Sequence, residues 1–198
     1  MTKLILASAS VARQRMLTEA GVPFTVQIAA VNENSLRSEL WTQTVSTEDA
    51  ALALADAKAR SFTNPSNDAT VIGADQILDL DGAWLEKPAD RDAARTQLLI
   101  LRGRTHRLVS AVSAWQRGER IWQTVDTAEL SMRAFTDDFV DYYIQQAGNA
   151  VLSSVGAYQL EGLGAQLFTS VRGDFFTILG MPLLPLLHFL RRQRILMP

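Results

Sequence analysis

The stretch ATVIGADQILDLDG, from Ala69 to Gly82, decides how this chain is interpreted. Its short apolar run, TVI, is typical of a buried strand, and the Asp-Gly pair at its end predicts a hairpin turn. We expect the first strand to end at Asp75, where the apolar run meets a carboxylate. An acid in that position is a candidate functional residue, although a turn or a helix cap would produce the same pattern.

Around this stretch, predicted strands and helices alternate without strict βαβ repeats. Apolar runs predict strands at 3–7, 24–31, 69–75, 105–116 and 120–135. Capping residues and periodicity predict helices at 10–21, 46–62, 88–101, 136–146 and from 182 onward. We interpret 32–45 as a loop or a broken helix, 156–168 as a Gly-rich loop with a strand, and 172–180 as a strand or loop. Two long strands joined by a turn at Gly118 imply antiparallel pairing, so we expect one α/β domain, 1–198, with a mixed sheet and a cleft between two lobes.

Composition excludes several classes of function. The chain has 198 residues, of which 47% are hydrophobic and 20% charged, and its net charge of −2 gives no reason to expect nucleic acid as a partner. It has no cysteine and only two histidines, which excludes disulfides, thiolate metal sites and multi-histidine zinc sites. There is neither a phosphate-binding P-loop nor a dinucleotide fingerprint. The apolar runs are too short for a signal peptide or a membrane span, so we expect a cytoplasmic protein.

The opening segment LASASVARQR combines hydroxyl groups and basic side chains at a helix start. Ser8, Ser10, Arg13 and Arg15, together with the free backbone N–H groups of the first turn, could bind an anion. The alternative is a helix capped by serine, with its arginines in solvent.

Two lysines and two acids complete the set of candidates. Lys58 lies in a helix rich in Ala and Leu, and Lys87 follows the predicted hairpin; either could contact phosphate or simply lie in solvent. Glu33 and Asp75 could hold a divalent cation through oxygen ligands and orient a water. A carboxylate beside phosphate-binding cations is suited to deprotonating that water.

Taken together, these segments resemble the Maf family of nucleotide pyrophosphatases, once described as septum-formation inhibitors. The family opening L-A-S-x-S-P-R-R is similar to LASASVAR, and the family motifs GADT…DG…KP, SGRTH and GAYxxQGxG are similar to GADQILDLDGAWLEKP, RGRTH and GAYQLEGLG. The shorter motifs DE, KA and GLP correspond to Asn32-Glu33, Lys58-Ala59 and GMP (180–182). The motifs occur in the right order over nearly the whole chain.

The resemblance implies an elongated mixed α/β fold with a deep cleft, similar to inosine triphosphate pyrophosphatases. It implies hydrolysis of a nucleoside triphosphate between the α and β phosphates, with Mg²⁺ or Mn²⁺ as the cofactor, and a possible homodimer. The matched positions suggest the following roles: Asp75 as proton acceptor, Glu33 and Asp75 at the metal, and Ser8, Ser10, Arg13, Lys58 and Lys87 at the triphosphate. Three positions depart from the family pattern: Val11, Ala12 and Asn32.

The family divides by substrate at three positions, which match Ala12, Gln76 and Glu161 here. Members acting on dTTP and UTP resemble R…T…Q, and members acting on 7-methyl-GTP resemble W…Q…E, so this chain matches the second group at two of three. A carboxylate at 161 can accept from the two adjacent donors of guanine and favours the cationic methylated base. Ala12 lacks a ring that could stack on that base, a role that Tyr158 could take instead.

Three alternatives to a 7-methyl-GTP pyrophosphatase stay open. The first is a dTTP/UTP pyrophosphatase of the same family. The second is a non-catalytic regulator of septum formation that binds nucleotide or a partner protein, which the changes at Val11, Ala12 and Asn32 would suit. The third is a housekeeping enzyme that removes several kinds of modified triphosphate.

Overall fold

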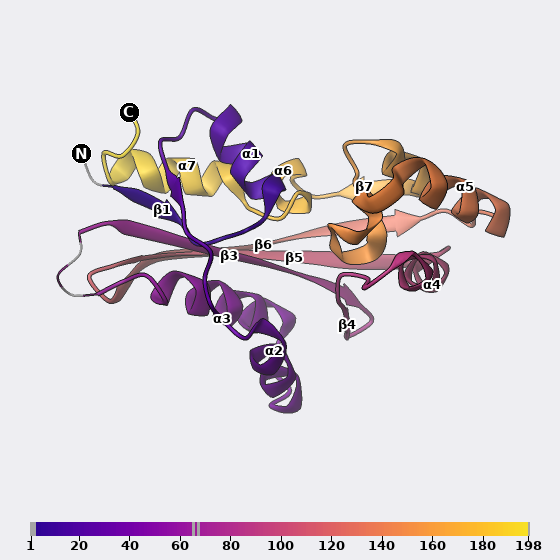
Figure 1. Cartoon of the computed structure of the whole chain (residues 1–198), viewed down its shortest axis with the longest axis horizontal. Coiled ribbons are helices and arrows are strands. Elements are labelled where there is room, and N and C mark those ends of the chain that lie inside the picture. Colours follow the sequence, from indigo (N-terminus) through magenta and orange to yellow (C-terminus); the bar gives the residue numbers. More distant parts are fainter. Residues whose placement is uncertain (1–2, 65, 67, 198) are drawn as a thin grey trace. The chain divides into compact units, whose positions relative to one another are not determined.

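The computed structural model describes residues 3–64, 66 and 68–197, and within them seven strands form one sheet (Figure 1). The strand order is β2-β1-β3-β5-β6-β7, with β4 paired to β3. The β1 strand is parallel to β2 and β3, whereas the β3–β4 and β6–β7 pairs are antiparallel. The strands are β1 (Leu4–Leu6), β2 (Thr25–Val26), β3 (Thr70–Leu80), β4 (Ala83–Leu85), β5 (Thr105–Gln116), β6 (Glu119–Met132) and β7 (Phe168–Arg172). The predicted α/β class with a mixed sheet is confirmed.

The α-helices and short 3₁₀ helices lie between the strands in the chain. The α-helices are α1 (Val11–Glu19), α2 (Glu33–Thr42), α3 (Thr47–Arg60), α4 (Arg91–Leu101), α5 (Asp137–Ala147), α6 (Phe175–Ile178) and α7 (Leu183–Arg192). The 3₁₀ helices are η1 (Gly148–Leu152), η2 (Val155–Ala157) and η3 (Leu163–Leu167). Among the residues that the structure describes, none of these helices has both the length and the apolar character that crossing a membrane requires.

The described chain divides into two compact units. The first takes the residues up to Gln76, then Val109–Asp126, and then those from Phe175 onward; the second takes Ile77–Leu108 and Thr127–Asp174. The long strands β3, β5 and β6 each run from one unit into the other.

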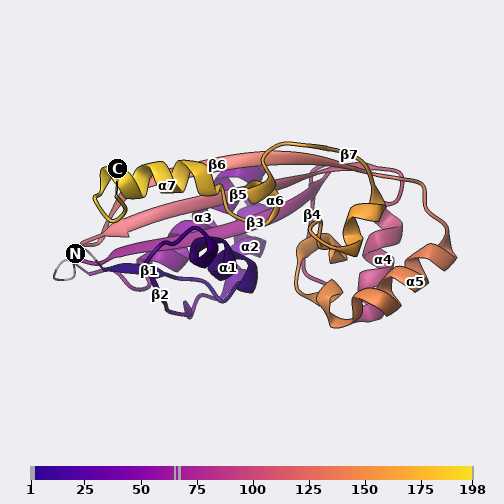
Figure 2. The same ribbon diagram turned by 90° about the horizontal axis from the view of Figure 1, so that it is seen from above.

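The first unit has a core on each face of its part of the sheet. The side chains of a strand alternate between faces, so Leu4 and Leu6 of β1 pack with α1 and α7, whereas Ile5 and Ala7 pack with Ala59 of α3. Figure 1 shows α1 and α7 on the same side of β1, and α3 on the other. Figure 2 gives the same region seen from above. The ends of β1 and β3 are thereby held between helices on both sides.

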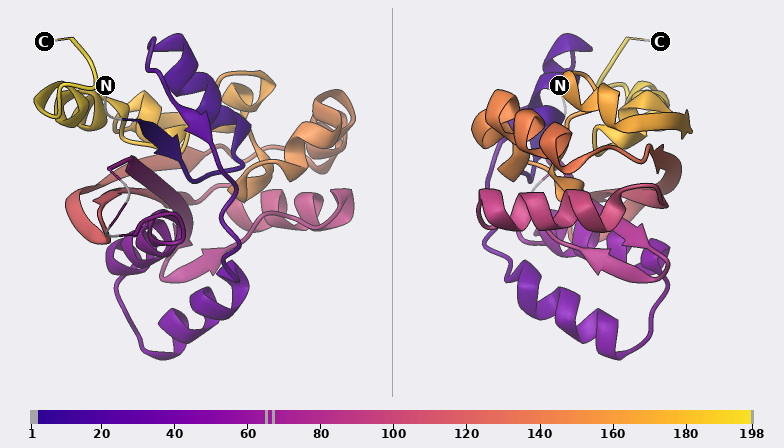
Figure 3. Two further views of the ribbon diagram at one scale, coloured as in Figure 1. Left: turned by 60° about the vertical axis from the view of Figure 1, so that its left-hand side comes forward. Right: turned by 90° about the vertical axis from the view of Figure 1, so that its right-hand side faces the viewer.

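The second unit is built around α4 and α5, which lie side by side (Figure 3). Ion pairs join them or their ends: Arg95 lies 2.6 Å from Asp141 Oδ1 and 3.7 Å from Asp137 Oδ2, and Arg102 Nη1 lies 2.6 Å from Asp137 Oδ1. Tyr143 of α5 is buried and donates its hydroxyl to the carbonyl of Ala157 at 3.2 Å. The 3₁₀ turns are thus tied to α5.

The structure corrects several of the predicted elements. The predicted strand 24–31 is reduced to two residues, Thr25–Val26, and the segment 156–168, predicted as a Gly-rich loop with a strand, contains parts of the 3₁₀ helices η2 and η3. The strand β3 does not end at Asp75 but continues to Leu80. The segment 32–45 is neither a loop nor a broken helix, because 33–42 forms one regular helix, α2. The segment 172–180 contains a helix, α6, where we predicted a strand or loop. The fourth helix begins at Arg91, because the side chain of Asp90 caps it by accepting from the backbone N–H of Ala93 at 2.8 Å.

The helix α2 escaped prediction for a physical reason. Helices are recognised in sequences by an apolar stripe that faces the core, and α2 has no buried residue. Its N-terminal signal is present, since Asn32 Oδ1 accepts from the backbone N–H of Ser35 at 3.1 Å. The predicted hairpin turn at Asp81-Gly82 is confirmed, because both residues adopt the positive φ angles (52° and 88°) that a tight hairpin requires.

Candidate active site

The acid singled out in the sequence, Asp75, lies near the middle of β3 and is only 4% exposed. Its Oδ1 accepts a hydrogen bond from Lys58 Nζ at 2.7 Å, and its Oδ2 lies 3.5 Å from Arg37 Nη2. A buried carboxylate is costly unless it is paired with a cation. These two contacts therefore explain why β3 can run on past Asp75 instead of ending there.

Lys58 reaches Asp75 because α3 packs unusually close to β3. A side chain at Gly73 would place its Cβ 2.0 Å from the carbonyl oxygen of Ala55 and 2.7 Å from the backbone nitrogen of Ala59. The absence of a side chain at 73 therefore allows the backbone of α3 to lie directly against the strand. The Lys58 side chain is only 9% exposed, and its ammonium group also lies 2.8 Å from Glu33 Oε2. One lysine thus bridges two carboxylates.

The helix α2 contributes an acid and a base on one face. Residues four apart on a helix are neighbours on its surface, and Glu33 and Arg37 are spaced in this way. Glu33 is 43% exposed and contacts Lys58, whereas Arg37 is 14% exposed and faces Asp75. Arg37 was not among the predicted site residues. The segment was interpreted as a loop or a broken helix, and without a regular helix there is no periodicity that places Arg37 beside Glu33. The signal that could have found it is the capping residue Asn32 followed by this spacing.

The serine-rich opening forms a second group at the start of α1. Ser10 caps the helix by accepting from the backbone N–H of Arg13 at 3.4 Å. Ser8 Oγ accepts from the backbone N–H of Ser10 at 3.2 Å and from Arg13 Nη1 at 3.4 Å. Arg15, by contrast, is exposed and pairs with Glu19 at 2.7 Å, so it does not join this group.

Arg13 is a buried cation whose guanidinium donates hydrogen bonds to neutral groups, Gly180 O and Ser8 Oγ. Its Nε donates to the carbonyl oxygen of Gly180 at 2.8 Å, and the residue is 8% exposed. Burial lowers the pKa of the guanidinium, while the negative charges of Asp75 and Glu33 act in the opposite direction. Arg13 is thus electrostatically linked to both acids, and an anionic ligand would relieve the cost of its burial.

The donor set fits a magnesium ion better than a softer metal. Glu33 and Asp75 provide two carboxylates next to one lysine, and Mg²⁺ is commonly held by one or two carboxylates with substrate phosphates and waters completing its shell. Within the described part of the chain, no group of three or more His, Cys, Asp or Glu side chains is placed to hold a metal. A full protein cage of the kind zinc requires is therefore not what these residues form.

Comparison with known proteins assigns the amino-acid sequence to a family. The family model described as Maf-like protein matches residues 3–193. The chain belongs to the Maf family. A protein of Paramagnetospirillum magneticum named nucleoside triphosphate pyrophosphatase is 54% identical over 194 residues, which are 98% of this chain and 100% of that relative. A Rhizobium meliloti protein named 7-methyl-GTP pyrophosphatase is 45% identical over 188 residues, covering 95% of this chain and 94% of its own.

A solved structure is also similar, but more distantly. The crystal structure of a nucleoside-triphosphatase, or dITP/XTP pyrophosphatase, from Mycobacterium abscessus has 17% identity and a TM-score of 0.42, and it covers 100% of this chain and 98% of that one. The predicted Maf resemblance is confirmed by the family model and by the sequence relatives.

The Maf motif positions in the first unit fall into two groups. Ser8, Ser10 and Arg13 gather at the start of α1, and Glu33, Lys58 and Asp75 gather where α2 and α3 meet β3. Ala12, where the family has an arginine or tryptophan, is partly buried on α1. Gln76 is partly buried, and its amide nitrogen contacts three acceptors within the protein. The roles assigned to all of these residues stay predictions.

The remaining Maf motif positions lie in the second unit. Lys87 is exposed just after β4, and Glu161 is exposed between η2 and η3. Tyr158, which we considered as a stacking partner for a base, is 4% exposed, and its hydroxyl oxygen lies 2.6 Å from His106 Nε2. That idea is wrong, because the ring is buried and packs edge-on against Phe168. The predicted cytoplasmic compartment and homodimer remain untested.

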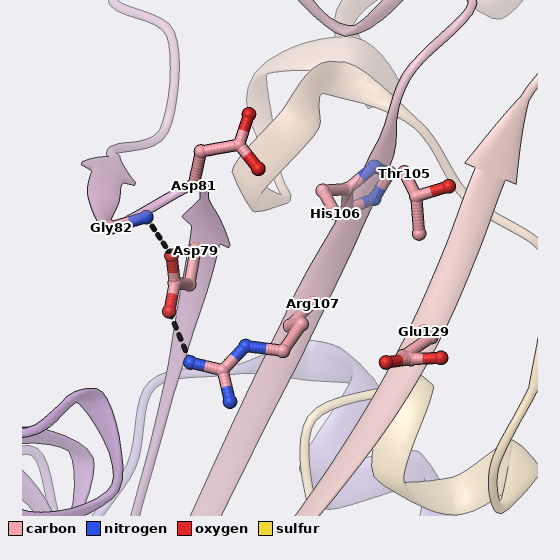
Figure 4. Close-up of a pocket in the computed structure, with 7 residues that line it drawn as sticks. All are labelled: Asp79, Asp81, Gly82, Thr105, His106, Arg107 and Glu129. Atoms are coloured by element: carbon pink, nitrogen blue, oxygen red, sulfur yellow. Dashed lines mark hydrogen bonds and ion pairs between the residues drawn. The ribbon is translucent and has the colours of Figure 1, made fainter.

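The second unit also contains a polar pocket that was not foreseen in the sequence (Figure 4). Its volume is about 380 Å³, and it lies between the Asp81-Gly82 turn and the first residues of β5. Asp79 is buried there; one of its oxygens accepts from the backbone N–H of Gly82 at 2.7 Å, and the other pairs with Arg107. These two contacts use Asp79 to hold the hairpin turn onto β5. The lining residues are Asp79, Asp81, Gly82, Thr105, His106, Arg107 and Glu129.

Proposed function

We propose that this chain is a nucleoside triphosphate pyrophosphatase that cleaves between the α and β phosphates. The observation that carries the proposal is the buried Asp75 held between Lys58 and Arg37. The cationic Arg13 and the hydroxyl of Ser8 belong to the same unit. Such a site offers positive charge for a polyphosphate and a carboxylate for a proton. The relatives named nucleoside triphosphate pyrophosphatase support the same activity.

The chemistry that these residues can perform follows from their charges. An ionised carboxylate has about four acceptor positions, and Lys58 and Arg37 occupy one on each oxygen of Asp75. In the proposed reaction, Asp75 accepts a proton from a water whose oxygen attacks the α-phosphorus. The bond from that phosphorus to the bridging oxygen breaks, and pyrophosphate leaves with the bonding electron pair. The products are a nucleoside monophosphate and pyrophosphate, which balances the addition of one water.

Positive charge would lower the barrier of this displacement. Phosphoryl transfer is accelerated mainly by positioning and by electrostatic stabilisation of the phosphate oxygens. Lys58, Arg37 and Arg13 provide three cationic groups for this purpose in the first unit. We propose that Glu33 and Asp75 also hold Mg²⁺ or Mn²⁺, which when bound would neutralise part of the triphosphate charge.

We further propose 7-methyl-GTP as the preferred substrate, with dTTP or UTP as the alternative. Relatives from Rhizobium meliloti and Brucella abortus, at 45% and 44% identity, are named 7-methyl-GTP pyrophosphatase. The exposed carboxylate at Glu161 supports the same choice, because it can accept from adjacent guanine donors and favours a cationic base.

The test is pyrophosphate release from 7-methyl-GTP, GTP, dTTP, UTP and CTP, each with Mg²⁺ and with Mn²⁺. We expect Asp75→Asn to lower turnover of the best substrate by at least about a hundredfold, the usual contribution of a general base. Asp141→Asn is the matched control, since Asp141 is an exposed acid paired with Arg95 in the second unit. If dTTP or UTP is turned over faster than 7-methyl-GTP, the preferred nucleobase is a pyrimidine and not 7-methylguanine. No turnover in folded protein would favour the regulator.

A further inference from the structure

The short segment Thr177–Gly180 is fixed by a dense set of hydrogen bonds to its carbonyl groups. The carbonyl of Thr177 accepts from Gln76 Nε2 at 3.0 Å, from Ser110 Oγ at 2.8 Å and from the backbone N–H of Gly180 at 3.0 Å. The carbonyl of Ile178 also accepts from Gln76 Nε2, at 3.1 Å. Thr177 is fully buried, and its hydroxyl donates to Asp126 at 2.6 Å.

Gln76 is the side chain that connects this segment to β3, the strand that carries Asp75. It follows Asp75 directly on β3 and therefore points to the opposite face of the sheet. Its amide nitrogen has two hydrogens, which are shared among three acceptors: Ser110 Oγ at 2.9 Å and the carbonyls of Thr177 and Ile178. Because carbonyls can only accept, the NH₂ group must face them and not the amide oxygen. Both N–H groups of Gln76 are therefore directed at groups within the protein.

The same segment ends at the carbonyl that holds Arg13. Arg13 Nε donates to Gly180 O at 2.8 Å. Gly180 adopts φ +106°, which favours glycine, and a Cβ there would lie 3.5–3.7 Å from the Arg13 guanidinium and from Gln76 Oε1. The two side chains therefore flank the same residue. Thr177 and Gly180 are three residues apart and joined by their own hydrogen bond, so the position of one carbonyl fixes the other.

We infer that Gln76 is a positioning residue for Arg13, acting through Thr177–Gly180. This inference rests on the proposed function for the use of Arg13 at the triphosphate, but the geometry that it describes does not. The amide of Gln76 holds the carbonyls of Thr177 and Ile178 in place, and their segment determines the position of Gly180 O. Gly180 O in turn accepts from Arg13 and so orients its guanidinium toward Ser8. A change at Gln76 should therefore weaken the binding of any polyphosphate, whatever base is attached to it.

The decisive probe is inorganic tripolyphosphate, which has the phosphates of the substrate but no base. We would measure its binding by calorimetry, with Mg²⁺, for wild type, Gln76→Met, Arg13→Met and the double variant. Methionine keeps the length of glutamine and removes its donors. We expect Gln76→Met to weaken binding about tenfold, the scale of losing a net interaction near 1.4 kcal/mol. In the Arg13→Met background we expect no further weakening, because a double-mutant cycle detects groups that act through one another.

The matched control is Gln116→Met. Gln116 Nε2 also donates to a backbone carbonyl, that of Asp68 at 2.7 Å, and it lies in the first unit. We expect this variant to bind tripolyphosphate as wild type does. If Gln76→Met does not fold, Ser110→Ala tests the same link, since it removes only the hydroxyl between Gln76 and Thr177. We expect a two- to threefold loss, the effect of one weak hydrogen bond; unchanged binding there would overturn the inference.

Two results for Gln76→Met would contradict the inference directly. One is unchanged tripolyphosphate binding together with a changed ratio of kcat/KM between 7-methyl-GTP and dTTP, as a base-reading residue would give. The other is a loss that is equally large with and without Arg13. Failure of the proposed function is a separate result: a wild type that turns over no nucleotide can still bind tripolyphosphate and show the cycle. If wild type binds no tripolyphosphate, Arg13 has no polyphosphate to hold and the inference also fails.

Discussion

Gly73→Ala is the most direct test of how the candidate site is built. A Cβ at this position would lie 2.0 Å from the carbonyl oxygen of Ala55, and an ordinary contact begins at 3.4 Å. The backbone of α3 must therefore retreat by about 1.4 Å, because neither group in the clash is a flexible side-chain end. A shift of that size moves Lys58 Nζ from 2.7 Å to beyond hydrogen-bond distance of Asp75.

Two quantities should change together in this variant. Overpacking a well-packed core costs about 1–3 kcal/mol, so we expect the free energy of unfolding in urea to fall by that amount. We also expect kcat for the best nucleotide to fall at least about tenfold, because the ion pair at Asp75, the proposed proton acceptor, is stretched. Gly162→Ala is the control for stability, since its φ is −131° and its nearest contact would be 3.9 Å away. The control should stay within about 0.5 kcal/mol of wild type.

The two measurements can refute separate parts of the reasoning. An unchanged unfolding free energy would show that α3 does not lie against β3 as described. A destabilised variant with undiminished kcat would show that the close packing of α3 does not serve the Lys58–Asp75 contact. Restoring the unfolding free energy with a stabilising osmolyte should leave kcat low, because osmolytes favour burial without removing the steric clash.

Three further predictions follow from other contacts. Arg37→Met should lower kcat/KM for the best nucleotide about tenfold or more, because a cation facing Asp75 is lost; Arg117→Gln, at an exposed arginine, should not, and equal kinetics in the two would argue against Arg37. Burial lowers the pKa of His106 to about 4, so the unfolded chain binds the extra proton first as pH falls. The contribution of His106 to the free energy of unfolding is therefore full above about pH 6.5 and is lost as the pH falls toward 4. The free energy of unfolding should change by up to about 1.4 kcal/mol per pH unit in this range. Urea titrations at several pH values should show that this dependence is removed in His106→Gln and kept in His188→Gln. Glu161→Gln should shift the ratio of kcat/KM from 7-methyl-GTP toward dTTP and UTP, and an unchanged ratio would remove the argument for this base.

The elements that could be predicted from the sequence are those whose signals lie in neighbouring residues. Strands, hairpin turns and capped helices depend on neighbouring residues, so β1, α1, α3 and the turn at Asp81-Gly82 were predicted close to their observed positions. The end of β3 was not, because a carboxylate within a strand looks like a stop. Only the tertiary contacts with Lys58 and Arg37 allow the strand to continue.

The candidate site shows the same division between local and distant information. Glu33, Lys58 and Asp75 were chosen from motifs, and the structure brings them together. Arg37 was missed because its role depends on the phase of a helix that buries none of its residues. The hydrogen bonds of Gln76 could not be predicted for a different reason. Ser110 lies 34 residues away in the chain, and Thr177 and Ile178 lie 101 and 102 residues away. Two of these acceptors are backbone carbonyls, which every residue type has, so the sequence gives no sign of them.

The change of the family acid pair to Asn32-Glu33 is consistent with an intact site. Asn32 is the cap of α2, a position that asparagine and aspartate fill about equally well, and its Oδ1 faces the backbone N–H of Ser35. The acid that remains, Glu33, is the one in contact with Lys58, 2.8 Å away. The substitution therefore keeps the hydrogen bond that sets where α2 begins, and the start of α2 sets the direction of both Glu33 and Arg37. What is lost is one negative charge beside a cation-rich site, which leaves the positive charge of Lys58, Arg37 and Arg13 less compensated and so favours a polyanionic substrate.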